Sequence, residues 1–508
     1  MTNADLAAGP GVDAPTQWDR LDPRTLVALP IKHVGSLGPI VAVVFLGGGG
    51  QSHERAMWAV LPVLAVLVVG FVRWGTTRYR VGVERVELRS GLFNRETRSV
   101  RRDRIRTVDL RASLGHRMMG LTVVEVGTGT GSAKSGRLNL DAVTVAEGER
   151  LRRELLDRSG ALPSSVVPEI GAIPQVAGHG SVEVARLNPL WLRYAPLTGS
   201  GLVAVGAVVG ATFKVASDAG VNLVNSATVS AAGDRLTAQP LGLTLGVLVL
   251  VVLAVASVGS IALYAEGWWN YRLSREPDNT LRLRRGLVTT RSLSIEQSRI
   301  RGAEVIEPVL LRLAGGARCA AVTTGLDEKT SSKGTLLPPA PVALAHRVAS
   351  AALLVEDPAS ATGSLLVRHP LAALRRRLTR AIGPSVAITV AAWWLHTSVT
   401  ALAWLWPVSL LLVPAAVLLA ADRYRNLGHA LHAEHLVLSY GSLIKRRVAL
   451  QRRGIIGWRL RQSPPQRWAG VLTLDAITAA GNGRYSVVDI APERAVELIE
   501  HINPELVT

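Results

Sequence analysis

The amino-acid sequence predicts a membrane protein in which α-helical hairpins, with about six transmembrane helices in all, alternate with three small α+β domains. Three observations lead to this fold class. Long apolar blocks occur three times, and a fixed spacing of glycine, isoleucine, arginine and glycine recurs after each block. Each copy of this spacing also lies among short runs in which apolar and polar residues alternate, and these runs are followed by a segment with helical periodicity. Each domain is therefore predicted to be a small β-barrel or sandwich with a C-terminal helix.

The apolar blocks run from about Val34 to Val72, from Leu197 to Val215 together with Leu241 to Tyr264, and from Ile382 to Ala421; a polar loop divides the second block. A single helix needs about 20 apolar residues to cross the hydrocarbon core of a bilayer. Blocks of this length therefore suit two crossings each. The first helix of the first block is short, and the third block needs a tight turn to cross twice. A re-entrant loop in place of one hairpin is the alternative interpretation.

The charge distribution predicts the orientation in the membrane. Lysine and arginine number 57 and the acidic residues 38, which gives a formal net charge of +19. The loops inside the hairpins carry few basic residues, whereas the regions between hairpins carry many, as in Arg375-Arg376-Arg377. By the positive-inside rule, we expect the soluble domains and both termini on the cytoplasmic side of a bacterial inner membrane. Nucleic-acid binding is disfavoured, because no motif of that class accompanies the charge.

The repeated spacing divides the chain into three units. A glycine is followed 14 residues later by an isoleucine and 15 residues after that by a second glycine, with an arginine three residues before it. These positions are Gly91, Ile105, Arg117 and Gly120; Gly286, Ile300, Arg312 and Gly315; and Gly441, Ile455, Arg467 and Gly470. We expect structural roles for them: the first glycine in a strand turn, and the arginine side chain on loop carbonyls near the second glycine.

The boundaries follow from the blocks and the repeat. The predicted segments are a tail (1–30), hairpin 1 (31–74), domain 1 (75–158), a linker (159–195), hairpin 2 (196–265), domain 2 (266–356), a juxtamembrane linker (357–381), hairpin 3 (382–422) and domain 3 (423–508). A proline precedes each hairpin, at Pro23, Pro189 and Pro370. The unit that repeats is thus a proline-led entry, a hairpin and a soluble domain.

The order of strand, glycine turn, Arg-Ile and Arg-x-x-Gly resembles the bacterial pleckstrin-homology-like (PH-like) domain. The tandem arrangement with paired crossings is similar to the YdbS/YdbT-like membrane proteins. The resemblance covers most of the chain and is best in the first repeat, around Asp103-Arg104-Ile105; the third departs from it at Arg453-Gly454-Ile455 and Pro464-Pro465. It implies PH-like domains and a membrane location, and it leaves the function undefined because a fold does not determine a function.

Two clusters are candidate binding sites. Arg95, Arg98, Arg101 and Arg102 form a basic stretch that is a candidate contact for anionic lipid head groups, with a solvated strand face as the alternative. His429, His432, Glu434 and His435 have the residue types of metal ligands, but we favour a solvated or interfacial junction there. The loop that begins at Gly127 lacks the spacing of a phosphate-binding loop. No catalytic residue, metal or cofactor is predicted.

The sequence therefore favours a non-enzymatic membrane protein whose domains act as a scaffold or docking surface, assisting export or envelope maintenance. A lipid-handling or transport protein that uses the helix bundle is the alternative. The expected partners are membrane lipids and other membrane or cytoplasmic proteins, without nucleic acid.

Overall fold

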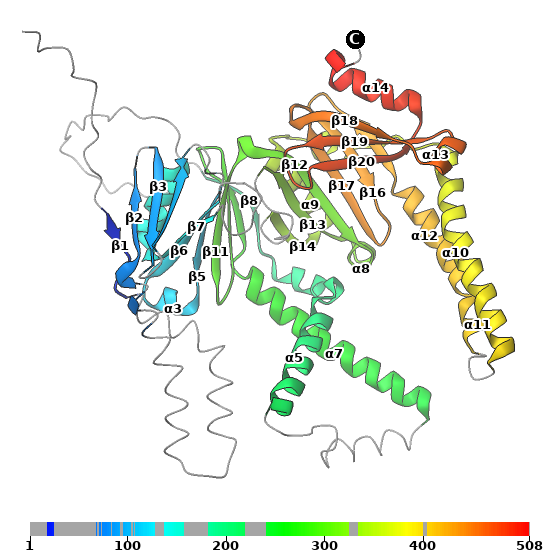
Figure 1. Ribbon diagram of the computed structural model, residues 1–508, viewed down its shortest axis with the longest axis horizontal. Coiled ribbons are helices and arrows are strands. Elements are labelled where there is room, and N and C mark those ends of the chain that lie inside the picture. Colours follow the sequence, from blue (N-terminus) through cyan, green and yellow to red (C-terminus); the bar gives the residue numbers. More distant parts are fainter. Residues whose placement is uncertain are drawn as a thin grey trace, which may run out of the picture. The chain divides into compact units, whose positions relative to one another are not determined.

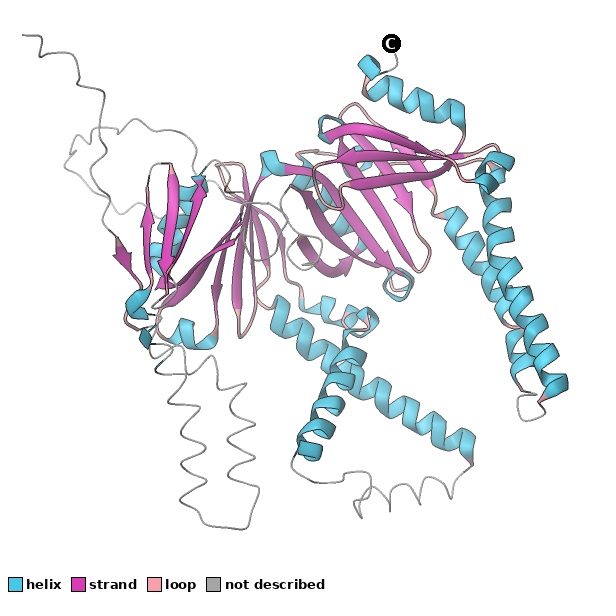
Figure 2. Cartoon of the chain, in the orientation of Figure 1, coloured by secondary structure: helices cyan, strands magenta, loops and turns pink. Residues whose placement is uncertain are grey.

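The computed structural model describes residues 18–24, 68, 71–72, 74–82, 84–91, 95–102, 105, 107–127, 137–156, 181–218, 240–324, 334–399 and 404–506. They belong to two compact units. Unit 1 is Met1–Ala172 with Val288–Ser294, and unit 2 is Ile173–Leu287 with Ile295–Thr508. Helices and strands of both are drawn in Figures 1 and 2. Predicted hairpin 1 lies almost wholly outside the described residues.

Unit 1 contains two antiparallel sheets. The first has the order β1-β2-β3-β4, with β1 (Asp19–Arg20), β2 (Arg78–Val81), β3 (Arg85–Ser90) and β4 (Glu96–Arg101). The second runs β7-β6-β5-β11, with β5 (Thr107–Ala112), β6 (Leu121–Gly127), β7 (Arg137–Thr144) and β11 (Thr290–Glu296). Its helices are α3 (Leu114–Met118) and α4 (Val145–Leu156). Strand β11 belongs to the second repeat in sequence, so the first repeat shares its sheet with a strand from the next.

The core of unit 1 follows from the alternation of its strands. Val86 and Leu88 on β3 are buried, and the side chains between them are more exposed, as expected for period two. Val108 on β5 and Leu151 on α4 join the same buried cluster. Helix α4 therefore covers one face of the sheets, as the closing helical pattern predicts.

The described part of unit 2 contains twelve further strands. One sheet runs β10-β9-β8, with β8 (Val182–Arg186), β9 (Arg272–Arg275) and β10 (Thr280–Arg285). The next runs β14-β13-β12-β17-β16-β15, with β12 (Ile300–Pro308), β13 (Gly316–Thr323), β14 (Thr335–Pro341), β15 (Gly428–Leu431), β16 (His435–Tyr440) and β17 (Ile444–Gln451). The last runs β18-β19-β20, with β18 (Ile455–Arg461), β19 (Leu472–Thr478) and β20 (Arg484–Ile490).

The helices of unit 2 are of three kinds. Short helices follow β12 and β18, and longer ones close the second and third repeats: α8 (Val309–Leu313), α13 (Pro464–Trp468), α9 (Val342–Leu353) and α14 (Pro492–Ile502). Apolar helices form the hairpins: α5 (Ser200–Asp218), α7 (Leu241–Trp268), α10 (Leu371–Ser398), α11 (Leu405–Ser409) and α12 (Leu412–Arg425). The short 3-10 helices are η2 (Pro189–Tyr194), η3 (Pro196–Thr198), η4 (Gln297–Arg299), η6 (Pro358–Ser360), η8 (Arg452–Gly454) and η9 (Pro504–Leu506).

The structure corrects the expected fold in two respects. Within the described part of the chain, three helical segments are long and apolar enough to cross a membrane, rather than six: Gly242–Trp268, Leu371–Thr397 and Leu405–Arg425. The sheets are also open instead of closed barrels. The reason is that the first strand of a C-terminal sheet pairs with a strand of the following repeat, as β12 does with β17, and so is not available to close a barrel.

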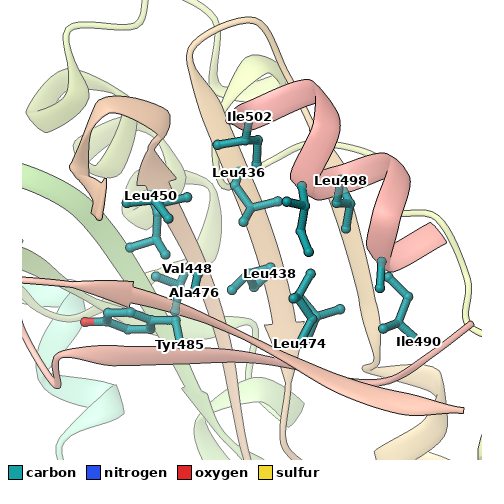
Figure 3. Close-up of a cluster of buried hydrophobic side chains, with 14 of the residues drawn as sticks. Leu436, Leu438, Val448, Leu450, Leu474, Ala476, Tyr485, Ile490, Leu498 and Ile502 are labelled. Atoms are coloured by element: carbon teal, nitrogen blue, oxygen red, sulfur yellow. The ribbon is translucent and has the colours of Figure 1, made fainter. Parts of the chain in front are cut away.

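The core of the third repeat is shown in Figure 3. Leu498 and Ile502 on α14 point toward the strands, where they meet Leu436, Leu438 and Leu474 in one buried cluster. The apolar positions of α14 recur at intervals of three and four residues, which places them on one helical face. This spacing explains how the C-terminal helix covers the two sheets of its repeat.

Candidate functional site

The first glycine of the repeat lies in the same turn each time. The turns precede β4, β11 and β17, and the glycine φ angles there are +107°, +113° and +104°, at Gly91, Gly286 and Gly441. Residues with a Cβ rarely adopt this conformation. The isoleucine 14 residues later is buried in every repeat, at Ile105, Ile300 and Ile455. The regular spacing therefore records a common backbone path.

The second glycine ends a five-residue helix, α3, α8 or α13, with φ between +61° and +70°. Its N–H donates to the carbonyl oxygen of the repeated arginine at 3.0–3.2 Å, from Gly120 to Arg117, Gly315 to Arg312 and Gly470 to Arg467. The arginine backbone thus closes the turn. The Arg312 guanidinium donates instead to the Asp422 carboxylate of α12 at 2.8 Å, which ties the second repeat to a membrane helix.

An exposed apolar residue follows each repeated arginine, and the sequence analysis overlooked it. Met118, Leu313 and Trp468 are 76%, 79% and 85% exposed. We call Arg117-Met118, Arg312-Leu313 and Arg467-Trp468 the tips of the three domains. The signal was present in the sequence, because an apolar side chain stands directly after the repeated arginine three times. Such a pair of basic and apolar side chains suits the boundary between water and lipid.

In unit 2, the glycine turns lie at the ends of the apolar helices. The Leu287 N–H donates to the carbonyl of Glu266 on α7 at 2.9 Å. The Ser442 hydroxyl lies 3.0 Å from the carboxylate of Asp422 on α12, and the neighbouring Leu443 is exposed. The Val309 N–H, at the start of α8, donates to the Leu443 carbonyl at 2.7 Å. Exposed apolar side chains therefore gather where the candidate spans end.

The predicted basic stretch does not form one uniform face. Arg95 and Arg101 are exposed, while Arg98 pairs with Glu96 at 2.8 Å. Arg102 donates to the carbonyl of Glu154 at the end of α4, so it holds the closing helix against the sheet. Arg98 and Arg102 are thus engaged within the domain, and lipid binding by this stretch stays a prediction.

The histidine cluster is dispersed by the hairpin of β15 and β16. His429 lies on β15 and His435 on β16, and both are buried instead of solvated. The His432 N–H donates to the carbonyl of His435 across the turn at 2.9 Å. Across the described residues, no group of three or more His, Cys, Asp or Glu side chains has the geometry to hold a metal ion.

A buried charged cluster joins the third hairpin to its domain. Asp489, at the end of β20, is fully buried and has a φ of +61°. Its carboxylate is paired with Arg376 and Arg377 at the start of α10, the latter at 2.7 Å, and it accepts from the Gln466 amide of α13 at 2.9 Å. We call these four residues the joint. The sequence analysis used the arginines for topology and did not identify their partner.

Two histidines extend the joint. His369 Nδ1 lies 3.0 Å from the carbonyl oxygen of Val488, so this nitrogen carries the proton and donates. Its Nε2 then accepts from His429 Nδ1 at 3.0 Å. Burial lowers the pKa of both imidazoles, and that of His429 falls to about 4. The pair is therefore neutral near pH 7 and connects the chain on both sides of hairpin 3.

The chemistry of these groups is that of binding and positioning. The carboxylate of Asp489 is engaged on both oxygens by cationic and amide donors. The single cysteine, Cys319, is fully buried on β13, and burial raises the pKa of its thiol. A buried neutral thiol is a poor nucleophile, because the thiolate is the reactive form.

Comparison with known proteins identifies relatives of the repeat. The sequence pattern of the bacterial PH domain matches residues 28–159, 220–353 and 382–506, which together make up more than half of the chain. The UPF0699 transmembrane protein YdbT of Bacillus subtilis (strain 168) is 22% identical over 277 residues, which are 53% of this chain and 54% of that protein. The chain thus spans about half the length of the curated relative it matches. No solved structure matches.

Proposed function

Because the chain belongs to the bacterial PH domain family, we propose that it is a non-enzymatic membrane scaffold whose PH-like domains form a docking surface. The observation that carries this proposal is that, in every repeat, the chain before the predicted hairpin pairs with the chain after it. The chain before a hairpin pairs with the strand after it in β1·β2, in β8·β9 and at the bridge between Val367 and His429. Domains held in this way are positioned platforms on a membrane.

These pairings also support the topology. Two chain segments that pair directly must leave the membrane on the same side, which requires an even number of crossings between them. The two candidate spans of hairpin 3, Leu371–Thr397 and Leu405–Arg425, meet this requirement for the third domain. The arginines between the hairpins support the proposal that the three domains lie on the cytoplasmic side of a bacterial inner membrane.

The tips supply the lipid-facing part of the proposal. An arginine near an anionic surface contributes about 1 kcal/mol of attraction, but the Arg312 guanidinium is already paired with Asp422, so the apolar side chains carry most of this contact. The exposed Met118, Leu313 and Trp468 are suited to enter the head-group layer beside it. With the tips directed at the lipid, the outer faces of the domains are left for protein partners, such as components of export or envelope maintenance.

The lipid contact is tested with a fluorescent probe in the full-length chain. Met118→Cys, Leu313→Cys and Trp468→Cys, each in a Cys319→Ala background, are labelled with an environment-sensitive dye and placed in nanodiscs with anionic lipid. We expect a blue shift and quenching by spin-labelled lipid at all three. Glu500→Cys on α14, an exposed position away from the tips, is the matched control. Tips that are no better quenched than this control would remove the lipid contact.

The docking role is tested separately by cross-linking in living cells and purification in detergent. We expect the same protein partners to be recovered repeatedly. Recovery of none, together with unquenched tips, would contradict the scaffold. Labelling of the tip cysteines by an impermeant maleimide in intact cells would contradict the cytoplasmic orientation. Lipid or solute movement in reconstituted vesicles would identify the lipid-handling alternative instead.

A further inference from the structure

Consecutive repeats are connected through their strand edges. In unit 1, the first strand of the C-terminal sheet, β5, has β11 of the following repeat as its neighbour. The Thr290 hydroxyl lies 3.4 Å from the Ala112 carbonyl across this junction. In unit 2, the equivalent strand β12 pairs antiparallel with β17 of the third repeat, from Gly302 opposite Leu450 to Pro308 opposite Ile444. The same type of junction therefore forms twice.

The two remaining strands of this kind have an open edge. Strand β18 corresponds to β5 and β12, and β4 corresponds to β11 and β17. Within the described residues, each is the last strand of its sheet. The difference is visible five residues after the repeated isoleucine, where Leu110 and Val305 are 7% and 0% exposed but Leu460 is 52% exposed. An apolar position that is covered in two repeats is therefore uncovered in the third.

Two equivalent glycines differ in the same way between the covered edge of β12 and the open edge of β18. Two residues after the repeated isoleucine stand Gly302 in the second repeat and Gly457 in the third. A Cβ at Gly302 would lie 2.6 Å from the Ala449 carbonyl oxygen of β17. A Cβ at Gly457 would meet nothing within 4 Å. Gly457 thus leaves room for a neighbouring backbone that its own sheet lacks.

The charges at the two open edges are complementary. Glu304 of β12 forms an ion pair with Arg446 of β17 at 2.9 Å across the internal junction. Glu304 lies four residues after the repeated isoleucine, and the residue at that position in the third repeat is Arg459. Arg446 lies five residues after the first glycine of its repeat, and the residue at that position in the first repeat is Glu96. The two open edges therefore carry opposite charges at the positions of this ion pair, with the signs exchanged. Arg459 and Glu96 are both exposed, and Glu96 would exchange its exposed ion pair with Arg98 for one with Arg459.

We propose that β18 of one molecule pairs antiparallel with β4 of a second molecule of this chain, in the register of β12 and β17. Gly457 then lies opposite Val100, Leu460 opposite Thr97, and Arg459 reaches Glu96. The contact joins two different surfaces, so it is heterologous and leaves a free β4 and a free β18 on the pair. Molecules anchored in one membrane would assemble into closed rings or rows.

The register is tested by disulfide formation between two differently tagged molecules in the same cells, both in a Cys319→Ala background. One carries Leu460→Cys and the other Thr97→Cys. Directly opposite residues of antiparallel strands lie within reach of a disulfide. We expect a cross-linked dimer that contains both tags. Ser99→Cys, two residues out of register on the same face of β4, replaces Thr97→Cys as the control and should cross-link at least several-fold less.

The energetics are tested by mass photometry of the full-length chain in detergent. Arg459→Glu and Glu96→Arg each place like charges together, and each should weaken association about tenfold, while the double variant should restore it. Gly457→Ala should weaken association without changing the thermal stability of the monomer, because its Cβ meets only the incoming strand. A change in monomer stability alone would indicate a purely structural glycine and count against the proposal.

Several outcomes would overturn the pairing. A chain that stays monomeric at micromolar concentration in detergent and in nanodiscs has no such contact. A disulfide between Thr97→Cys and Leu460→Cys that forms only within one doubly substituted chain would show that the edges close on the same molecule. Equal cross-linking of Thr97→Cys and Ser99→Cys would reject the register, and failure of the double charge variant to recover association would reject the ion pair.

Discussion

Replacement of Asp489 by asparagine tests whether the joint holds the third domain to its hairpin. The change Asp489→Asn keeps the size of the side chain and suits the positive φ, since asparagine tolerates this region better than most residues. It removes the charge that neutralises Arg376 and Arg377, two largely buried guanidinium groups. Loss of one partner from a buried ion pair costs about 3–5 kcal/mol, because the remaining charge is left uncompensated.

The assay is hydrogen exchange of the full-length chain in nanodiscs, followed at β20 and at the start of α10. A loss of about 3 kcal/mol in the local opening free energy raises the exchange rate by about two orders of magnitude, at about 1.4 kcal/mol per factor of ten. The increase should appear on both sides of the joint. Helix α9, which belongs to another repeat and does not contact Asp489, serves as the internal reference.

The matched control is Glu497→Gln on α14, which removes a carboxylate from an exposed ion pair with Arg494 in the same domain. Exposed pairs contribute about 0–1 kcal/mol, so exchange should hardly change. If β20 is as well protected from hydrogen exchange in Asp489→Asn as in Glu497→Gln, the joint does not stabilise the attachment of the domain, and the role assigned to Asp489 is wrong.

The remaining predictions concern pH, backbone strain and thiol reactivity. Because burial lowers the pKa of His369 and His429, the latter to about 4, unfolding takes up protons below the unfolded value of about 6.5. The thermal unfolding temperature should therefore be highest above pH 6.5 and fall as the pH is lowered toward 4. In His429→Asn this fall should be smaller. Gly441→Ala sets a Cβ at positive φ and 2.0 Å from the Ile444 carbonyl oxygen, so it should cost about 1–3 kcal/mol in denaturant unfolding. Cys319 should resist alkylation in the folded chain and react on unfolding; rapid labelling without unfolding would contradict its burial.

The parts of the fold that depend on local signals were predictable. Alternation in β3 and the interval pattern of α14 identify a strand and a helix, because both periodicities are properties of the backbone. The glycine turns were predictable for the same reason, since a positive φ selects glycine at Gly91, Gly286 and Gly441. The departure of the third repeat has a local cause as well: Pro464 and Pro465 occupy the first turn of α13, where a missing N–H costs nothing.

The parts that depend on distant partners were not predictable. The sequence of an apolar strand such as β12 does not indicate which strand will pair with its edge. Its partner, β17, lies more than a hundred residues later in the chain. The closed barrel was expected for this reason. The joint presents the same difficulty, since Arg377 and Asp489 are brought together only by the folded third domain. Helices α3, α8 and α13 are too short to show a periodicity, so the tips on them were missed.

The strand pairing across each hairpin has a consequence for how the protein is made. β8 leaves the ribosome long before β9, and the whole of hairpin 2 separates them. Under the proposed topology, the sheet that contains both would close only after the intervening helices had entered the bilayer with their two ends on one side. A hairpin inserted with an odd number of crossings would leave β8 and β9 in different compartments and their hydrogen bonds unmade. On that topology, each soluble domain would complete its folding only on a correctly inserted hairpin.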